Sequence, residues 1–125
     1  MDNIMEKITD SELEVMKVLW ASDLPLPLSS IRSSLQSKMN WEAATIKTLL
    51  SRLVLKKAVL QEKKEVFYYS PLVEEEKYNV WATSQLINRL YNGKASNLVA
   101  ALLNTEGLSQ DDISDLRRMF LGENR

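Results

Sequence analysis

Residues 43–69 read AATIKTLLSRLVLKKAVLQEKKEVFYY, and this stretch decides the fold. Its first part repeats apolar residues at the i, i+3, i+4, i+7 spacing of one helical face, which predicts a helix over residues 43–57. Two runs rich in β-branched and aromatic residues follow, at positions 58–61 and 66–69. They are separated by Glu62-Lys63-Lys64-Glu65, so we expect a short β-hairpin with a charged tip.

Two further helices are expected upstream of this stretch. Thr9 and Glu12 have the spacing of a capping box, in which each side chain satisfies a free backbone N–H of the first turn. A helix should therefore start there, and Pro25 and Pro27 should follow it in an extended connector. Ser29 is the expected N-cap of a second helix that ends near residue 37 or 38.

Three helices followed by a hairpin with a basic tip are the elements of a winged helix-turn-helix, in the order typical of that fold. On the helix of residues 43–57, a rotation of 100° per residue places small and polar side chains opposite the apolar face. They are Ala44, Lys47, Thr48 and Ser51, with Thr45 and Arg52 at the edge. Such groups can approach a surface closely and donate to base edges and phosphates. The alternative is that Thr and Ser occupy an ordinary solvated face.

The charge distribution supports a polyanion partner, although the whole chain carries a net charge of −1. Residues 29–64 hold eight basic against two acidic residues, an excess of +6 that averages out along the chain. A basic hairpin tip alone could equally serve solubility. The eight are Arg32, Lys38, Lys47, Arg52, Lys56, Lys57, Lys63 and Lys64.

The C-terminal part, residues 72–125, is expected to be a helical dimerisation region joined to a winged-helix domain of residues 1–71. Glu74, Glu75 and Glu76 favour the positive end of a long helix, and Asn92-Gly93 should end it. Two shorter helices should follow, the last starting at Ser109. About 50 residues are too few for a core of their own, so we expect burial against a partner chain. The alternative is a monomer folded back on the winged domain. The expected contact residues are Tyr78, Trp81, Leu86, Leu90, Tyr91, Leu98, Leu102, Ile113, Leu116 and Phe120.

Composition narrows the possible functions. The chain has no Cys and no His, which removes disulfides, thiolate metal sites and the commonest general base. Three glycines do not make a phosphate-binding loop. We therefore expect no cofactor, no metal and no catalytic residues, and hence no enzyme. No apolar run approaches the roughly 20 residues that a membrane span needs, and the first residues are acidic, so a cytoplasmic location without membrane insertion is expected.

Four blocks of the sequence are familiar: ITDSELEVMKVLW at residues 8–20, TIKTLLSRL at 45–53, VFYYSP at 66–71 and NRLYNG at 88–93. In these blocks the sequence resembles the penicillinase-repressor family, the BlaI/MecI group of bacterial transcriptional repressors, which also includes copper-responsive CopY proteins. The similarity spans nearly the whole chain in order.

This resemblance implies a homodimer whose winged helices each enter a major groove of a pseudo-palindromic operator, blocking RNA polymerase. The implied DNA-binding residues are Trp41, Ala44, Thr45, Lys47, Thr48, Arg52, Lys63 and Lys64. Three positions depart from common family residues: Ala44 replaces Lys, Lys57 replaces Gly and Leu55 replaces a basic residue. These departures concern operator sequence and affinity.

Release from DNA is left open by the sequence. In relatives that sense antibiotics, a membrane sensor triggers cleavage at an Asn-Phe bond, and the matching positions here are Ala101 and Leu102. Copper-responsive relatives use a cysteine cluster, which this chain lacks. A rival interpretation is a protein-interaction module, in which the winged helix turns its recognition face to a protein and not to DNA.

Overall fold

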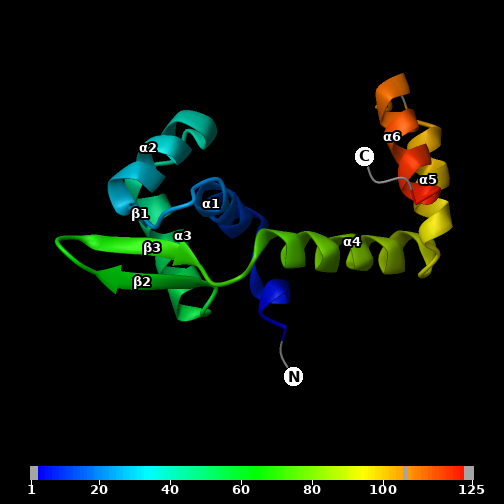
Figure 1. Cartoon of the computed structure of the whole chain (residues 1–125). Coiled ribbons are helices and arrows are strands. Elements are labelled where there is room, and N and C mark those ends of the chain that lie inside the picture. The colour runs from blue at the N-terminus through cyan, green and yellow to red at the C-terminus, as the bar shows by residue number, and fades with distance from the viewer. Residues whose placement is uncertain (1–2, 106, 123–125) are drawn as a thin grey trace. The chain divides into compact units, whose positions relative to one another are not determined.

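The computed structural model describes residues 3–105 and 107–122 (Figure 1). Its elements include short turns and strands between longer helices. In chain order they are η1 (Ile4–Lys7), α1 (Asp10–Trp20), β1 (Leu26–Pro27), α2 (Leu28–Met39), α3 (Ala43–Leu55), β2 (Val59–Lys63), β3 (Phe67–Pro71), α4 (Glu75–Tyr91), α5 (Ala95–Leu103) and α6 (Gln110–Phe120).

The chain forms two compact units. The first extends to Trp81 and holds the sheet and the helices up to the first half of α4. The second begins at Ala82 and holds the rest of α4 together with α5 and α6. The domain boundary after residue 71 stays a prediction.

The start of α1 confirms the capping box. The Glu12 backbone N–H donates to Thr9 Oγ1 at 3.2 Å, and the Thr9 N–H donates to Glu12 Oε1 at 3.0 Å. For α2 the expected N-cap was wrong, because the cap is Pro27 and Ser29 lies inside the first turn. The extended backbone of β1 ends at Pro27, so the helix begins directly after it. It ends at Met39, where Asn40 adopts a left-handed conformation with φ 57°.

Helix α3 ends two residues before the predicted position 57. Lys57 has φ 66°, and its N–H donates to the Val54 carbonyl at 3.0 Å while the Ala58 N–H donates to the Leu53 carbonyl at 3.0 Å. These two bonds form a Schellman motif, in which glycine usually occupies the left-handed position. A lysine in this conformation costs about 1 kcal/mol relative to glycine.

The sheet has three antiparallel strands in the order β1-β3-β2. In the hairpin Lys63 pairs with Phe67, so the turn is residues 64–66 and the first strand is longer than predicted. The third strand, β1, was not predicted. It pairs Leu26 with Tyr69 and Pro27 with Tyr68, so the extended connector pairs with the middle of the hairpin.

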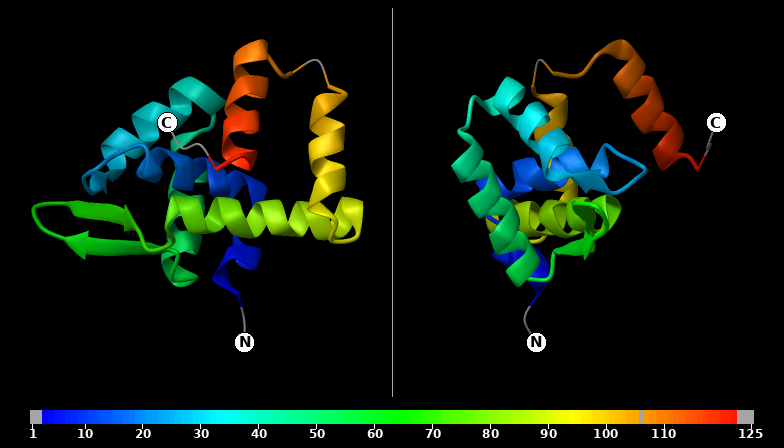
Figure 2. Two further views of the ribbon diagram at one scale, coloured as in Figure 1. Left: turned by 45° about the vertical axis from the view of Figure 1, so that its right-hand side comes forward. Right: turned by 90° about the vertical axis from the view of Figure 1, so that its left-hand side faces the viewer.

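The core of the first unit lies where α1 packs against α2, α3 and β3. Figure 2 shows the hairpin of β2 and β3 projecting beyond these helices. The apolar face predicted for α3 is confirmed, since Ile46, Leu49, Leu50 and Leu53 are all buried. The other fully buried large apolar side chains are Val15, Met16, Leu19, Ile31, Leu35 and Val59.

In the second unit, α6 begins with the expected cap. Ser109 Oγ accepts from the Asp112 N–H at 3.0 Å, and Asp112 Oδ2 accepts from the Ser109 N–H at 3.1 Å. None of the described residues from position 82 onward is fully buried. Phe120 and Met119 remain 70% and 65% exposed, so the unit itself gives its apolar faces little cover.

Candidate nucleic-acid interface

The outward face of α3 carries the side chains predicted to read DNA. Its exposed residues are Ala44, Thr45, Lys47, Thr48, Ser51 and Arg52. Thr48 Oγ1 donates to the Ala44 carbonyl at 2.9 Å, which uses its proton but leaves its oxygen available as an acceptor. Trp41 is half-buried just before the helix. The helix therefore presents small, hydroxyl and basic groups on one side and apolar groups on the other.

A hollow of about 430 Å³ lies beside this face and is lined by residues of β1, α2, α3 and the β2–β3 hairpin. Its basic groups are Arg32 of α2 and Lys47 of α3, and none of its lining residues is acidic. A concave surface lined with one sign of charge concentrates the field of its cations and attracts a polyanion. The remaining lining residues are Pro27, Leu28, Ser29, Ser51, Gln61, Val66, Phe67 and Tyr69.

The first turn of α2 contributes backbone donors near this hollow. Pro27 makes no side-chain capping hydrogen bond, so no cap occupies the N–H groups at the start of the helix. These N–H groups and the helix dipole favour an anion. Together with the Arg32 guanidinium, this end of α2 suits a backbone phosphate.

The two lysines at the tip of the hairpin lie in different surroundings. Lys63 Nζ lies 5.5 Å from the centre of the Phe67 ring, and that ring lines the basic hollow. Gln61 is two residues before Lys63 on the same strand and donates from Nε2 to Tyr69 Oη at 3.0 Å. Lys63 therefore shares a side of the hairpin with the hollow beside α3.

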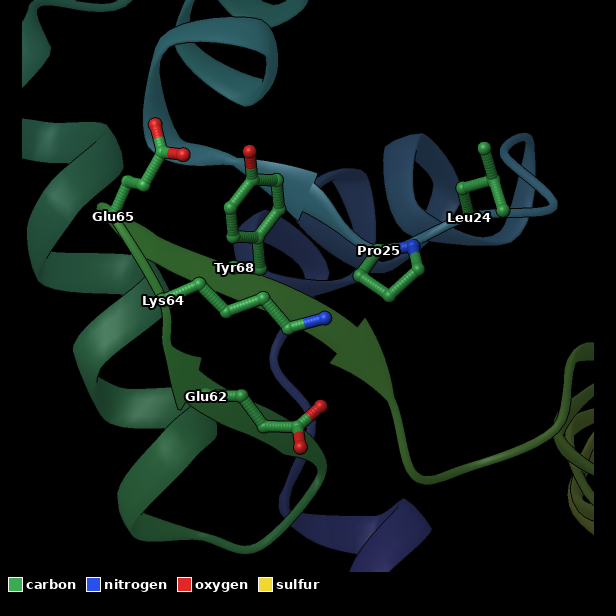
Figure 3. Close-up of a pocket in the computed structure, with 6 residues that line it drawn as sticks. All are labelled: Leu24, Pro25, Glu62, Lys64, Glu65 and Tyr68. Atoms are coloured by element: carbon green, nitrogen blue, oxygen red, sulfur yellow. The ribbon is translucent and has the colours of Figure 1, made fainter.

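Lys64 lines a separate hollow of about 370 Å³ (Figure 3). There it extends between Tyr68 and Glu62, with Glu65 beside them on the turn. Leu24 and Pro25 complete the lining. The two carboxylates balance the lysine charge, so this side of the hairpin has no excess of positive charge.

Two lysines of the basic segment are engaged in ion pairs with α1. Lys38 Nζ lies 3.4 Å from Glu14 Oε1, and Lys17 Nζ lies 3.3 Å from Glu14 Oε2. Burial acts to raise the pKa of the Glu14 carboxyl, but the hydrogen bonds and charges of Lys17 and Lys38 outweigh it and hold that pKa below its usual value. Lys56 is paired with the buried Glu12 at 2.6 Å. Fewer lysines are therefore available to a polyanion than the eight basic residues of the segment 29–64 indicate.

Several residues of this surface were missed by sequence reasoning about the site. Ser29, Gln61 and Phe67 line the hollow but were not predicted as binding residues, and Arg32 was noted only for its charge. The signal for Gln61 and Phe67 was the two-residue alternation along the hairpin, which places them on the same side as Lys63. Ser29 lies in the first turn of α2 because β1 ends directly before that helix, and β1 was not predicted from the sequence.

The residues predicted for dimerisation fall into two groups. Tyr78 is buried within the first unit, with its ring 5.6 Å from those of both Trp20 and Trp81. Trp20 Nε1 also donates to the Val73 carbonyl at 2.8 Å. Trp81 is half-buried and ends the same unit. The other eight lie from Leu86 onward and are half-buried (Leu86, Tyr91, Leu98, Leu116) or exposed (Leu90, Leu102, Ile113, Phe120). Ala101, beside Leu102 in α5, is half-buried.

The architecture and this face define a winged helix-turn-helix protein with a basic recognition surface. A family model described as penicillinase repressor matches residues 8–121. The methicillin resistance regulatory protein MecI of Staphylococcus aureus (strain N315) is 35% identical over 122 residues, which cover 96% of this chain and 98% of the relative. The penicillinase repressor of Bacillus licheniformis is 36% identical over 116 residues, covering 91% and 89%. The chain belongs to the penicillinase repressor family.

Two solved structures resemble part of this chain. The solution structure of the DNA-binding domain of the repressor BlaI has a TM-score of 0.55 and 37% identity, and covers 62% of this chain and 94% of that one. The solution structure of monomeric B. licheniformis BlaI with the blaP half-operator has a TM-score of 0.51 and 38% identity, covering 57% and 87%. The predicted family and winged-helix fold are thereby confirmed.

Among the described residues, no helix has both the length and the apolar character of a membrane span. Within the same residues, no cluster of three or more His, Cys, Asp or Glu side chains suits a metal ion.

Proposed function

We propose that this chain is a transcriptional repressor that binds a double-stranded DNA operator in a sequence-specific manner. The single observation that carries the proposal is the shared surface of α3, the start of α2 and one side of the hairpin, which gathers Arg32, Lys47 and Lys63 without an acidic neighbour in its hollow. The family supports it, because one relative is a methicillin resistance regulatory protein, another is a penicillinase repressor, and one solved relative is in complex with a half-operator. No catalytic role is proposed.

In this mechanism α3 enters the major groove. Lys47 and Arg52 can donate to base edges or phosphates, and the small side chain of Ala44 allows close approach. Arg32 and the start of α2 hold one backbone phosphate, and Lys63 holds another from the wing. Bound repressor then occludes the promoter from RNA polymerase.

The test is DNA binding by the full chain and by a Lys47→Ala/Arg52→Ala double variant. Wild type should retard a duplex from its own promoter region at low salt, and the double variant should lose at least tenfold in affinity because each good base contact contributes about 1–3 kcal/mol. Both proteins should show the same helix content. Failure of wild type to bind any such duplex would reject the proposed repressor function. Binding to a protein partner with an affinity that does not depend on salt would support the interaction module.

We propose that the functional form is a homodimer. The apolar side chains left exposed on α5 and α6 support this, since a 44-residue unit with no fully buried described residue lacks a core of its own. Two-fold symmetry of the dimer requires an inverted repeat in the operator. A cytoplasmic location follows from this role.

A membrane sensor protease system is proposed as the partner that releases the repressor. The positions matching the scissile bond of relatives, Ala101 and Leu102, lie inside α5, so cleavage there requires local unfolding of that helix. Intact-mass analysis of the chain from induced cells tests this route. A full-length mass in fully derepressed cells would reject it.

A further inference from the structure

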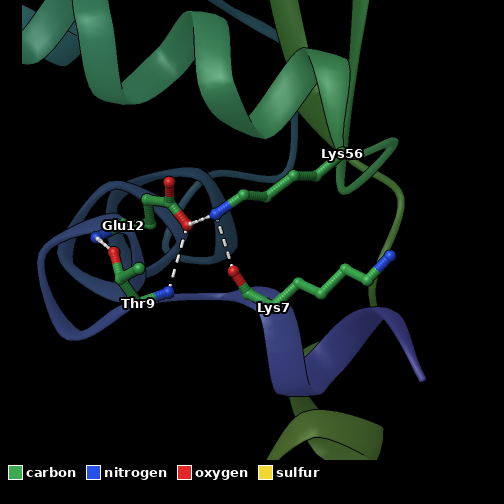
Figure 4. A network of polar contacts seen from close by, with 4 residues as sticks. All are labelled: Lys7, Thr9, Glu12 and Lys56. Atoms are coloured by element: carbon green, nitrogen blue, oxygen red, sulfur yellow. Dashed lines mark hydrogen bonds and ion pairs between the residues drawn. The ribbon is translucent and has the colours of Figure 1, made fainter. Parts of the chain in front are cut away.

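An ion pair between a buried carboxylate and a partly exposed lysine connects α1 to the end of the recognition helix (Figure 4). Glu12 is fully buried in the first turn of α1, and its Oε1 lies 2.6 Å from Nζ of Lys56. Lys56 is the C-cap residue of α3, 44 positions further along the chain. The pair therefore joins two helices through one carboxylate oxygen.

The two groups are held by backbone as well as by each other. Glu12 Oε1 also accepts the Thr9 N–H at 3.0 Å, and Lys56 Nζ also donates to the Lys7 carbonyl at 2.7 Å. The end of η1, the cap of α1 and the end of α3 thus converge on one point. Charge-assisted hydrogen bonds of this kind are short and directional, so they fix geometry more strictly than apolar contacts do.

The rest of the α1–α3 contact has no such directional constraint. The two helices also pack against each other, the buried side chains of α3, such as Leu50 and Leu53, are apolar, and apolar burial is not directional. A small shift of α3 would preserve most of this burial. It would not preserve hydrogen bonds to base edges, which weaken steeply outside their normal distance and angle.

We propose that the Glu12–Lys56 pair positions the recognition helix and thereby sets the specificity of operator reading without contacting DNA. This inference rests on the proposed repressor function. Lys56 is a positioning residue: its ammonium is directed at Glu12 and Lys7, and its side chain is only 26% exposed. It therefore differs from Lys47, Arg52 and Lys63, whose charges face the solvent side of the winged unit.

The experiment compares Glu12→Gln and Lys56→Met with wild type in the full chain. Two duplexes are used as probes, one from the chain's own promoter region that wild type prefers and one of scrambled sequence, each titrated over a range of salt. Both variants should lose about tenfold in affinity for the preferred duplex, the loss expected for one impaired base contact. Binding to the scrambled duplex and the salt dependence should stay unchanged.

Glu14→Gln is the matched control. Glu14 lies two residues from Glu12 on the same helix and pairs with Lys38 of α2, but it is partly exposed. This variant changes the charge by the same amount and should keep the wild-type preference between the two duplexes. If Glu12→Gln loses affinity for the preferred duplex and Glu14→Gln does not, the loss follows from the Glu12–Lys56 pair and not from the net charge.

Three results would overturn the proposal. An unchanged preference in both variants would show that α3 keeps its position without the pair. Equal losses on both duplexes, matching a reduced folded fraction by circular dichroism, would show a purely structural role. A salt slope lowered by about 0.9 per subunit in Lys56→Met would make Lys56 a direct phosphate contact.

Should Lys56→Met not fold, Glu12→Gln decides, because its amide keeps an oxygen acceptor. Failure of wild type to prefer either duplex would instead reject the proposed function.

Discussion

Replacing Lys63 by Ala should weaken DNA binding more than replacing its neighbour Lys64. Lys63 stacks over Phe67 on the side of the hairpin that faces the basic hollow, whereas Lys64 lies with Glu62 and Glu65 in a separate hollow. A phosphate reached by the wing should therefore be neutralised by Lys63. The charge of Lys64 is already balanced by its acidic neighbours.

The size of the effect follows from counterion release. Each phosphate contact contributes about 0.9 to the slope of log affinity against log salt concentration, so a dimer that loses both Lys63 contacts loses about 1.8. Over a fourfold change in salt, for instance 50 to 200 mM, the affinity of wild type should fall by about tenfold more than that of Lys63→Ala.

Fluorescence anisotropy with a labelled promoter duplex at four or more salt concentrations measures both slopes. Lys64→Ala removes the same charge one residue away and should leave the slope within about 0.5 of wild type, less than one phosphate contact. Equal slope changes in the two variants, or a larger one for Lys64→Ala, would refute the assignment of the two sides of the hairpin. Identical slopes in all three proteins would show that the wing does not touch phosphate.

Three further predictions concern single side chains. Burial, reinforced by the charge of Asp10, raises the pKa of Tyr78 above its ordinary value despite the opposing charge of Lys17. The folded state therefore loses stability as pH rises above about 10, where tyrosine ionises in the unfolded chain. Between about pH 8 and pH 11 the urea midpoint of Tyr78→Phe should rise relative to that of wild type. A difference between the two midpoints that stays constant with pH would contradict this. Leu55, 82% exposed at the end of α3, should become a phosphate contact in Leu55→Arg, steepening the salt slope by about 0.9 per subunit in the same anisotropy assay; an unchanged slope would place this position away from DNA. Phe120→Asp should convert a dimer to a monomer in light scattering without changing the fold of the first unit, whereas a wild-type mass of one chain would remove the dimer altogether.

Local patterns predicted most of the helical architecture. The apolar repeat of α3 and the Thr9–Glu12 capping box are properties of neighbouring residues, and the structure confirms both. The predicted start of α2 was wrong because the observed start depends on β1. That strand is only two residues long and exists through pairing with β3, more than 40 positions away, which no local pattern reveals.

The candidate site was predictable where helical rotation decides it and unpredictable where long-range contacts do. The six exposed positions on the polar face of α3 follow from its period alone. Lys56 could not be separated from the other basic residues, because its partner Glu12 is distant in sequence and looks like an ordinary helix-capping residue. Lys63 and Lys64 could be told apart only once the hairpin register fixed which strand residue faces which hollow.

The two-residue strand β1 has a consequence for the thermodynamics of operator binding. A hairpin anchored only by its own two strands would be mobile in the free protein, and DNA would have to immobilise it. Pairing of Leu26 and Pro27 with Tyr69 and Tyr68 of β3 ties the middle of the hairpin to the residue that precedes α2. The wing is thus ordered before it meets DNA, so association should involve little loss of backbone entropy there, and small rearrangements at the start of α2 should be transmitted to the wing.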